Sequence, residues 1–281
     1  MNALFIHDID PVLVTIGPLA IRYYGLFFAL AAILGLFILK YLFKQKGYNP
    51  NFVDEYILYL LIGIIVGARL IHVMFYHPEF YCNNPVEIFK VWKGGIASHG
   101  ATLGSIVATY IFAKRKMLTF YQVADLAVIP IALGTAFIRL GNFINSEIVG
   151  KVTDLPWGVI FQRYHGFKVN GKIYPPEAEH ILPRHPSQIY EMFMGLIVFG
   201  LLFYLFKKYR EKLANGIIFY SFLISYFVLR FIVEFFKEFQ TLIPNKSLFT
   251  MGQWLSIAFI LAGIIGVYKV RNNRTPQKKK K

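Results

Sequence analysis

The chain has 281 residues, 56% of them hydrophobic and 16% charged, and a formal net charge of +15. This composition is too apolar for an ordinary water-soluble domain, so we expect one polytopic membrane domain over residues 1–281. Basic residues gathered in short loops more commonly set topology and contact anionic lipid than bind nucleic acid, so no nucleic-acid partner is expected. The single cysteine, Cys82, excludes an internal disulfide and suggests no cysteine-based metal site.

Seven apolar segments approach or exceed the length that crosses a bilayer. They predict membrane-spanning helices at residues 17–43, 54–76, 96–113, 121–140, 188–206, 215–237 and 250–270. The third segment is short and rich in glycine, so its length supports a span least. No basic region precedes the first segment and no small-residue cleavage site follows it, so we interpret it as a retained helix. The expected fold is an all-α membrane protein with about seven transmembrane helices.

Basic residues form four clusters that fall on one side of the membrane if all seven segments cross it. The clusters lie at residues 40–46, 114–116, 207–212 and 269–281. Cytoplasmic loops are enriched in lysine and arginine, so the N-terminus is predicted outside and the C-terminus inside. Residues 269–281 then form a basic cytoplasmic tail, and residues 142–187 a small extracytoplasmic head.

A hairpin is predicted within this outer loop. The pair Asn170-Gly171 separates two short segments with strand-like composition, residues 167–169 and 172–174. An Asn-Gly pair suits the two left-handed positions of a tight turn between antiparallel strands.

A polar cluster follows the fourth apolar segment, in the stretch from Ile138 to Gly150. Within nine residues the chain places a guanidinium, two carboxamides and a carboxylate, which belong to Arg139, Asn142, Asn145 and Glu147. Charges at membrane depth are costly and normally face a protein interior or a wet cavity, so the cluster indicates a functional site. The alternative for Arg139 alone is a side chain that extends to the interface from a helix end.

Other polar residues fall at a similar depth. With a rise of about 1.5 Å per residue, Arg69 and Arg230 each lie roughly 22 Å from the inner ends of their segments. We predict a cavity open to the outer leaflet, lined by Arg139, Arg230, His99, Glu147 and Tyr24. Two arginines at one cavity suit an anionic ligand, and a phospholipid phosphate matches their planar guanidinium groups.

Simpler alternatives exist for several of these residues. Arg230 and Glu234 are spaced i, i+4 and could neutralise each other. His99 alone could be a structural histidine. One helix face carries polar and aromatic side chains that we interpret as an interfacial belt, Arg69, His72 and Tyr76.

The sequence RLGNFINSE at Arg139–Glu147, followed by Gly150, resembles the signature of bacterial prolipoprotein diacylglyceryl transferases. Four further blocks resemble the same family in the same order: residues 23–25, 94–100, 184–191 and 230–235. Together the blocks cover nearly the whole chain. The outer loop at residues 151–183 matches least.

The resemblance implies a seven-helix enzyme of the bacterial inner membrane, without metal or cofactor. Such enzymes transfer the diacylglyceryl group of phosphatidylglycerol to the lipobox cysteine of prolipoprotein signal peptides and release glycerol 1-phosphate. It implies that Arg139 and Arg230 hold phosphate and that His99 is the base. The implied catalytic residues are His99, Arg139, Arg230, Glu147 and Tyr24, and the implied substrate-binding residues are Arg139, Arg230, Asn142, Asn145, Gly150 and Glu234.

The chemistry of thioether formation is consistent with these residue types. A thiolate must displace a phosphate ester, and an unperturbed cysteine has a pKa of about 8.5. His99 is the expected proton acceptor, because imidazole titrates near neutral pH. Glu147 is the rival base, although we expect it to face Arg139 as an ion-paired carboxylate that orients the guanidinium. The nucleophile comes from the peptide, so Cys82 needs no role.

Two other functions compete with this one. A lipid or anion transporter predicts polar groups at mid-membrane and often an internal repeat, whereas here the polar groups lie to one side and no repeat is visible. An intramembrane serine protease requires a buried serine nucleophile with a base, and no Gly-x-Ser-Gly stretch occurs in the sequence.

Overall fold

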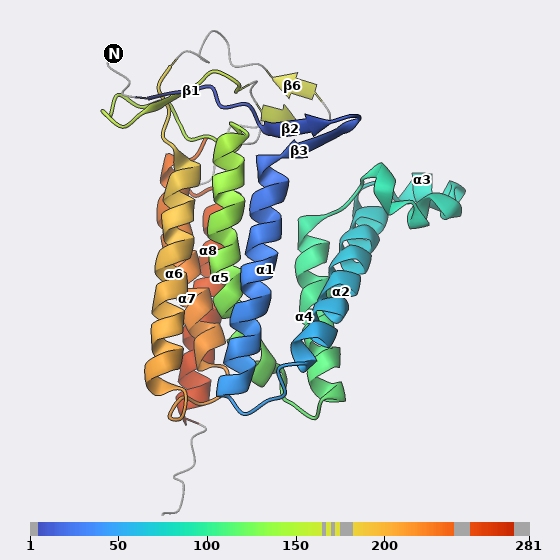
Figure 1. Ribbon diagram of the computed structural model, residues 1–281, viewed down its shortest axis with the longest axis vertical. Coiled ribbons are helices and arrows are strands. Elements are labelled where there is room, and N and C mark those ends of the chain that lie inside the picture. Colours follow the sequence, from blue (N-terminus) through green and yellow to red (C-terminus); the bar gives the residue numbers. More distant parts are fainter. Residues whose placement is uncertain (1–4, 165–166, 170–171, 175–181, 239–247, 273–281) are drawn as a thin grey trace, which may run out of the picture. The chain divides into compact units, whose positions relative to one another are not determined.

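The computed structural model describes residues 5–164, 167–169, 172–174, 182–238 and 248–272 (Figure 1). The long helices in these ranges are α1 Tyr23–Gln45, α2 Phe52–Phe75, α4 Ser98–Arg115, α5 Phe120–Ile144, α6 Ser187–Tyr209, α7 Ile217–Val233 and α8 Met251–Asn272. The helical membrane fold is therefore confirmed, and each predicted span corresponds to one of these helices. In the described ranges six of them, all but α4, are long and apolar enough to cross a membrane. A total of seven spans remains a prediction, because α4 is short and carries polar residues at both ends.

The chain divides into two units, which are described separately. The first comprises Met1–Phe37 and Val128–Lys281, and the second comprises Ile38–Ala127.

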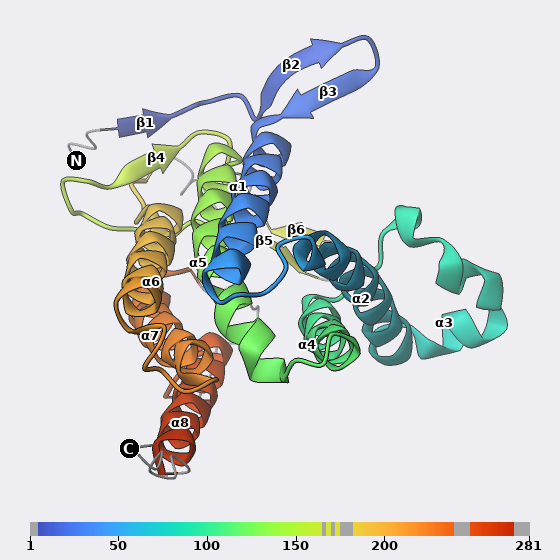
Figure 2. The same ribbon diagram turned by 60° about the horizontal axis from the view of Figure 1, so that its bottom comes forward.

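In the first unit, α7 packs between α6 and α8 (Figure 2). Between α7 and α8, the rings of Phe227 and Phe259 stack with centroids 4.4 Å apart. Gly195 of α6 lies against Ala132 and Ala136 of α5, so α5 packs on the same bundle. These contacts bring together the ends of α5, α6 and α7 that carry the predicted site.

Short strands accompany the helices of this unit. Strand β1 (Phe5–His7) pairs in parallel with β4 (Val159–Phe161), and β2 (Val12–Ile16) pairs antiparallel with β3 (Leu19–Arg22). Strand β5 (Phe167–Val169) pairs antiparallel with β6 (Lys172–Tyr174), which confirms the predicted hairpin, although its turn residues lie outside the described ranges. The segment between α5 and α6 thus folds together with the N-terminal strand, a pairing that the sequence pattern did not indicate.

A small apolar core holds the segment between α5 and α6. Val149, Val159, Phe161 and Tyr164 are buried together, with Phe143 of α5 packed against them. His7 is fully buried beside them: its ring lies 4.6 Å from that of Phe143, and its Nδ1 lies 3.1 Å from Ser146 Oγ.

Several predicted helix boundaries were wrong, and α7 ends at Val233 and not at residue 237. Residues 17–22 are not helical, because Gly17 has a φ of +57° in the turn before β3, and α1 begins at Tyr23. Helix α5 runs to Ile144 and not to residue 140, so Asn142 is helical and does not lie in the loop. No residue at that end breaks the backbone hydrogen bonds, and the Asn145 N–H still donates to the Gly141 carbonyl over 3.0 Å. Of the predicted basic tail, residues 273–281 lie outside the described ranges.

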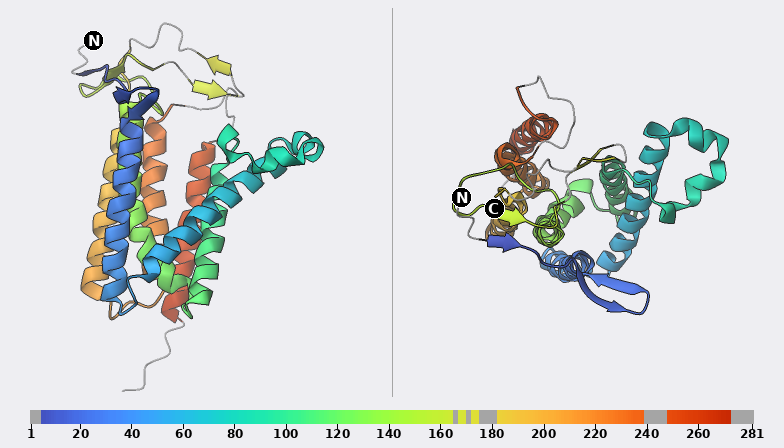
Figure 3. Two further views of the ribbon diagram at one scale, coloured as in Figure 1. Left: turned by 45° about the vertical axis from the view of Figure 1, so that its right-hand side comes forward. Right: turned by 90° about the horizontal axis from the view of Figure 1, so that it is seen from above.

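In the second unit, α2 and α4 pack against each other (Figure 3). The buried Tyr56 hydroxyl lies 2.9 Å from Thr109 Oγ1 between the two helices. The connection between them contains α3 (Pro78–Asn83) and two 3-10 turns, Pro85–Phe89 and Val91–Lys93.

The interpretation of Arg69 as part of an interfacial belt was wrong. Its guanidinium is buried and donates hydrogen bonds to the carbonyls of Ile88, Gly94 and Gly95 over 2.6 to 2.9 Å. Five donors on one planar group can satisfy a whole loop of carbonyls, so Arg69 holds the α2–α4 connection in place.

Candidate functional site

The end of α5 and the residues after it form a local hydrogen-bonded cluster. Asn142 Nδ2 donates to Glu147 Oε1 over 2.7 Å, and Asn145 Nδ2 donates to the same oxygen over 3.1 Å. Arg139 Nη1 donates to Asn142 Oδ1 over 3.2 Å. The arginine therefore reaches Glu147 only through Asn142, and the expected direct Arg139–Glu147 ion pair is not present among the described contacts.

The backbone around Glu147 adopts an unusual conformation. Ser146 and Ile148 have φ values of +53° and +58°, which residues other than glycine seldom adopt. The first turn of α6 holds this backbone: Ser187 Oγ donates to the Ile148 carbonyl over 2.9 Å, and Gln188 Nε2 donates to the Glu147 carbonyl over 2.8 Å. Such conformations persist where the surroundings impose them, and they concentrate at functional sites.

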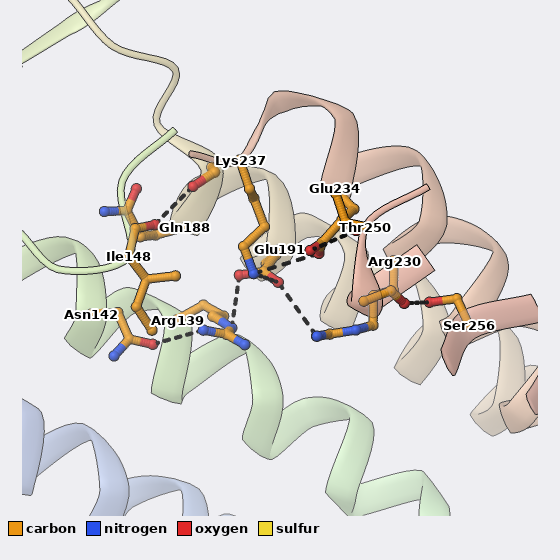
Figure 4. A network of polar contacts seen from close by, with 12 residues as sticks. Arg139, Asn142, Ile148, Gln188, Glu191, Arg230, Glu234, Lys237, Thr250 and Ser256 are labelled. Atoms are coloured by element: carbon orange, nitrogen blue, oxygen red, sulfur yellow. Dashed lines mark hydrogen bonds and ion pairs between the residues drawn. The ribbon is translucent and has the colours of Figure 1, made fainter. Parts of the chain in front are cut away.

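A second cluster forms where Arg139 meets α6 and α7. Glu191 of α6 is fully buried, and its Oε2 lies 3.0 Å from Arg139 Nε. Its other oxygen, Oε1, lies 3.8 Å from Arg230 Nη1 and 3.5 Å from Lys237 Nζ. Figure 4 shows the three cationic side chains converging on this carboxylate.

Glu234 does not neutralise Arg230 in the way its i, i+4 spacing suggests. In the described part of the chain its ion-pair partner is Lys237, at 3.7 Å, and it accepts a hydrogen bond from Thr250 Oγ1 over 3.3 Å. The reason is that α7 ends at Val233, so Glu234 lies in a 3-10 turn and faces the start of α8.

Two glycines allow the elements of the site to approach closely. A Cβ at Gly141 would lie 2.8 Å from the Tyr24 ring, so this glycine lets α1 place Tyr24 against the site-bearing end of α5. A Cβ at Gly150 would lie 2.5 Å from the His185 carbonyl oxygen and 2.6 Å from that of Phe236. Gly150 therefore joins the chain before α6 to the chain after α7, directly beside Lys237, with which it forms a β-bridge.

His99 belongs to the other unit. It is the second residue of α4, its side chain is exposed, and no hydrogen bond to it is found within the described ranges. The predicted residues therefore divide into one group around Arg139, which the structure brings together, and His99 by itself.

An aromatic cavity of about 380 Å³ lies near Gly150. Its lining comprises Leu155, Trp157, His185, Tyr190, Val233 and Phe236. The Tyr190 hydroxyl accepts a hydrogen bond from Trp157 Nε1 over 2.9 Å and lies 3.1 Å from His185 Nδ1. Burial, and then the positive charge of Lys151, lower the pKa of His185, so its imidazole is neutral at pH 7.

Glu191 and Lys237 were absent from the predicted site. A usable signal for Glu191 existed, because a carboxylate in the first turns of an apolar helix needs a cationic partner. Nothing local distinguishes Lys237 from a lysine at a membrane interface. Within the described ranges, no three histidine, cysteine or acidic side chains are grouped to hold a metal.

A family model and several known proteins resemble this chain. The family model described as prolipoprotein diacylglyceryl transferase matches residues 11–269. Proteins named phosphatidylglycerol--prolipoprotein diacylglyceryl transferase resemble the chain over most of its length. The protein from Tolumonas auensis is 40% identical, over 91% of this chain and 93% of its own. Those from Chloroherpeton thalassium and Bordetella parapertussis are 36% and 39% identical, each over 93% of this chain and over 92% and 95% of their own.

Proposed function

Because this chain belongs to the prolipoprotein diacylglyceryl transferase family, we propose that it transfers the diacylglyceryl group of phosphatidylglycerol to the lipobox cysteine of prolipoproteins. The reaction forms a thioether, releases glycerol 1-phosphate and begins lipoprotein maturation. The observation that carries the proposal is the group of three cations, Arg139, Arg230 and Lys237, at adjoining ends of apolar helices. The phosphate of a membrane lipid is an anion that can lie at the ends of membrane-spanning helices.

The bonds that form and break define what the site must do. The cysteine sulfur attacks the terminal sp³ carbon of the diacylglyceryl group, and the bond from that carbon to the phosphate oxygen breaks. The electron pair leaves with glycerol phosphate, and the thiol proton passes to a base. Negative charge grows on the phosphate, where Arg230 and Arg139 stabilise it most effectively because they are already in place.

Arg230 is the better candidate for direct phosphate contact. Its ion-pair distance to Glu191 is 3.8 Å, longer than an ordinary hydrogen bond, so its guanidinium keeps donors for two phosphate oxygens. Arg139 is held on two sides, by Glu191 at 3.0 Å and by Asn142 at 3.2 Å. It therefore presents only its remaining edge to the ligand.

Supporting roles follow from the same contacts. Glu147, which accepts hydrogen bonds from Asn142 and Asn145, orients these two amides. Tyr24 packs at Gly141, which lies between Arg139 and Asn142 in the sequence of α5. Gly150 and Glu234 shape the chain around Lys237. His99 remains the proposed base for the incoming thiol, with Glu147 as its rival.

We assign the protein to the bacterial inner membrane, with seven spans, the N-terminus outside and the C-terminus in the cytoplasm. The four basic clusters of the sequence support this orientation. A reporter fused after Lys281 should be active in the cytoplasm, and a tag within residues 151–180 should be accessible from outside. A C-terminal reporter found outside would contradict the orientation and the proposed depth of the site.

The function is tested with purified protein in liposomes. Phosphatidylglycerol and a lipobox peptide should yield a thioether-linked peptide, detected by its mass, with one glycerol 1-phosphate released per peptide. Liposomes of phosphatidylethanolamine, or a peptide with serine in place of the lipobox cysteine, should give neither product. Lipid movement without glycerol 1-phosphate release would instead indicate a transporter.

A further inference from the structure

Glu191 occupies an unusual electrostatic position. Its carboxylate is fully buried and faces cationic side chains from three different segments: Arg139 from α5, Arg230 from α7, and Lys237 from the residues that follow α7. A buried carboxylate without such partners would be strongly destabilising. The three cations therefore make the burial of Glu191 possible. The Glu191 carboxylate in turn attracts the three cationic side chains and keeps them close to one another.

The charges in this cluster do not balance. Three cations face two carboxylates, Glu191 and Glu234, so the cluster carries one excess positive charge. Only the Arg139–Glu191 contact is short, at 3.0 Å. Lys237 lies 3.5 and 3.7 Å from the two carboxylates, and like Arg230 it retains donors for a further anion.

We propose that Glu191 is a positioning residue that holds Arg139 in its reactive orientation. The same carboxylate keeps Arg230 and Lys237 close together as a pair of phosphate-binding cations. This inference rests on the proposed function, because it assigns the excess charge to the phosphate of the lipid substrate. Lys237 then acts as a third cation of the phosphate site, beside the two arginines.

A positioning role predicts an effect that a structural role does not. Replacing Glu191 by glutamine keeps the size and polarity of the side chain but removes its charge, so the cluster gains a second excess positive charge. Ground-state anions should then bind more tightly. Turnover should nevertheless fall, because Arg139 loses the carboxylate that orients its guanidinium. Loss of packing alone would weaken anion binding and turnover together.

The experiment compares wild type, Glu191→Gln and Glu191→Asp in phosphatidylglycerol liposomes with a lipobox peptide. In Glu191→Gln, kcat should fall on the order of 10²-fold, the loss expected when a catalytic group is displaced by about 1 Å. Inorganic phosphate should inhibit this variant several-fold more tightly than wild type. Glu191→Asp keeps the charge, so its phosphate inhibition should match wild type while its kcat is partly reduced.

The matched control is Glu238→Gln. Glu238 follows Lys237 in the chain, but its side chain pairs with the buried Arg184 at 3.0 Å and has no described ion pair or hydrogen bond with the three cations. This variant should lower the unfolding temperature without tightening phosphate inhibition. If Glu191→Gln retains wild-type kcat, or if its phosphate inhibition weakens in parallel with kcat, the inference is wrong.

Two further comparisons keep the test decisive. If Glu191→Gln does not fold, Glu191→Asp decides: phosphate inhibition that weakens together with kcat would contradict positioning. Direct calorimetric binding of inorganic phosphate separates this inference from the proposed function. A wild type that binds phosphate but forms no thioether would overturn the function, while the phosphate affinities of the variants would still test Glu191.

Discussion

Asn142 Nδ2 donates to Glu147 Oε1 over 2.7 Å, from the last turn of α5 to a residue flanked by two left-handed backbone positions. The contact closes a loop between residues five positions apart, and the first turn of α6 anchors the backbone of this loop. Asn142 Oδ1 also accepts a hydrogen bond from Arg139. The carboxamide of Asn142 therefore links Arg139 to Glu147, although these two side chains have no described direct contact. The amide thus needs both its donor and its acceptor.

This arrangement predicts different losses for two substitutions of Asn142. Asn142→Asp removes the donor to Glu147 and places a second carboxylate beside it, so kcat should fall on the order of 10²-fold or more. Asn142→Gln keeps both polar groups and should retain more activity than Asn142→Asp. Thioether formation on one folded preparation of each variant provides the measurement. Equal activity of Asn142→Asp and wild type would contradict the coupling role.

The two arginines should fail in different ways. In Arg139→Lys, a single ammonium cannot contact both Glu191 and Asn142, so kcat should fall on the order of 10²-fold with little recovery relative to Arg139→Ala. Arg230→Ala should chiefly raise KM for phosphatidylglycerol. Arg163, a surface arginine paired with Asp8 and Asp10, supplies the control, and Arg163→Ala should leave both constants near wild type. A folded Arg139→Ala protein with near-normal turnover would refute the phosphate assignment.

His99→Gln tests the identity of the base. Glutamine keeps size and polarity but accepts no proton near neutral pH, so turnover should fall by roughly 10²- to 10⁴-fold while phosphatidylglycerol binding persists. Both quantities are measured across pH on one preparation. Substantial remaining turnover with an unchanged pH profile would transfer the role to Glu147 or to solvent.

Gly150→Ala should destabilise the folded protein by about 1–3 kcal/mol, because the new methyl group would overlap two backbone carbonyl oxygens that cannot move independently. Gly200 lies in α6, and a methyl group added there would meet no described atom within 4 Å, so Gly200→Ala is the control and should be nearly neutral. Thermal unfolding in detergent compares the two. Equal unfolding temperatures would show that the chain around Gly150 adjusts.

The buried His7 should make stability depend on pH. Burial lowers its pKa below the ordinary value of 6.5, so the unfolded chain binds the proton more readily than the folded one. The contribution of His7 to stability is therefore complete above pH 6.5 and is lost as the pH falls through the lower, folded-state pKa. His185, whose pKa is lowered by burial and by Lys151, acts in the same direction.

The measurement is the unfolding temperature between pH 7.5 and about pH 5, since the shift begins near the histidine reference value. It should decline below pH 6.5 in wild type and decline less in His7→Asn, in which residue 7 does not titrate. An unfolding temperature that rises on acidification, or an identical decline in both proteins, would contradict this assignment.

Local properties of the sequence were sufficient to predict the helices and their order. Apolar length, turn residues and basic clusters belong to single segments, and each predicted span corresponds to one helix, with boundaries that differ by up to six residues. The cluster that begins at Arg139 could also be predicted, because a guanidinium and two carboxamides at the end of an apolar segment can be recognised from the sequence alone. The Asn-Gly hairpin is equally local.

Only the tertiary structure decided which charges meet. Arg139 pairs with Glu191, 52 positions further along the chain, and not with the nearby Glu147. Arg69 turns inward to bind backbone carbonyls, and His7 is buried against Ser146. The physical reason is that a buried charge takes whichever partner the packing of helices brings within about 4 Å, where Coulomb attraction offsets desolvation. Sequence spacing sets that distance only within one helix, and the packing of α5, α6 and α7 sets it between them.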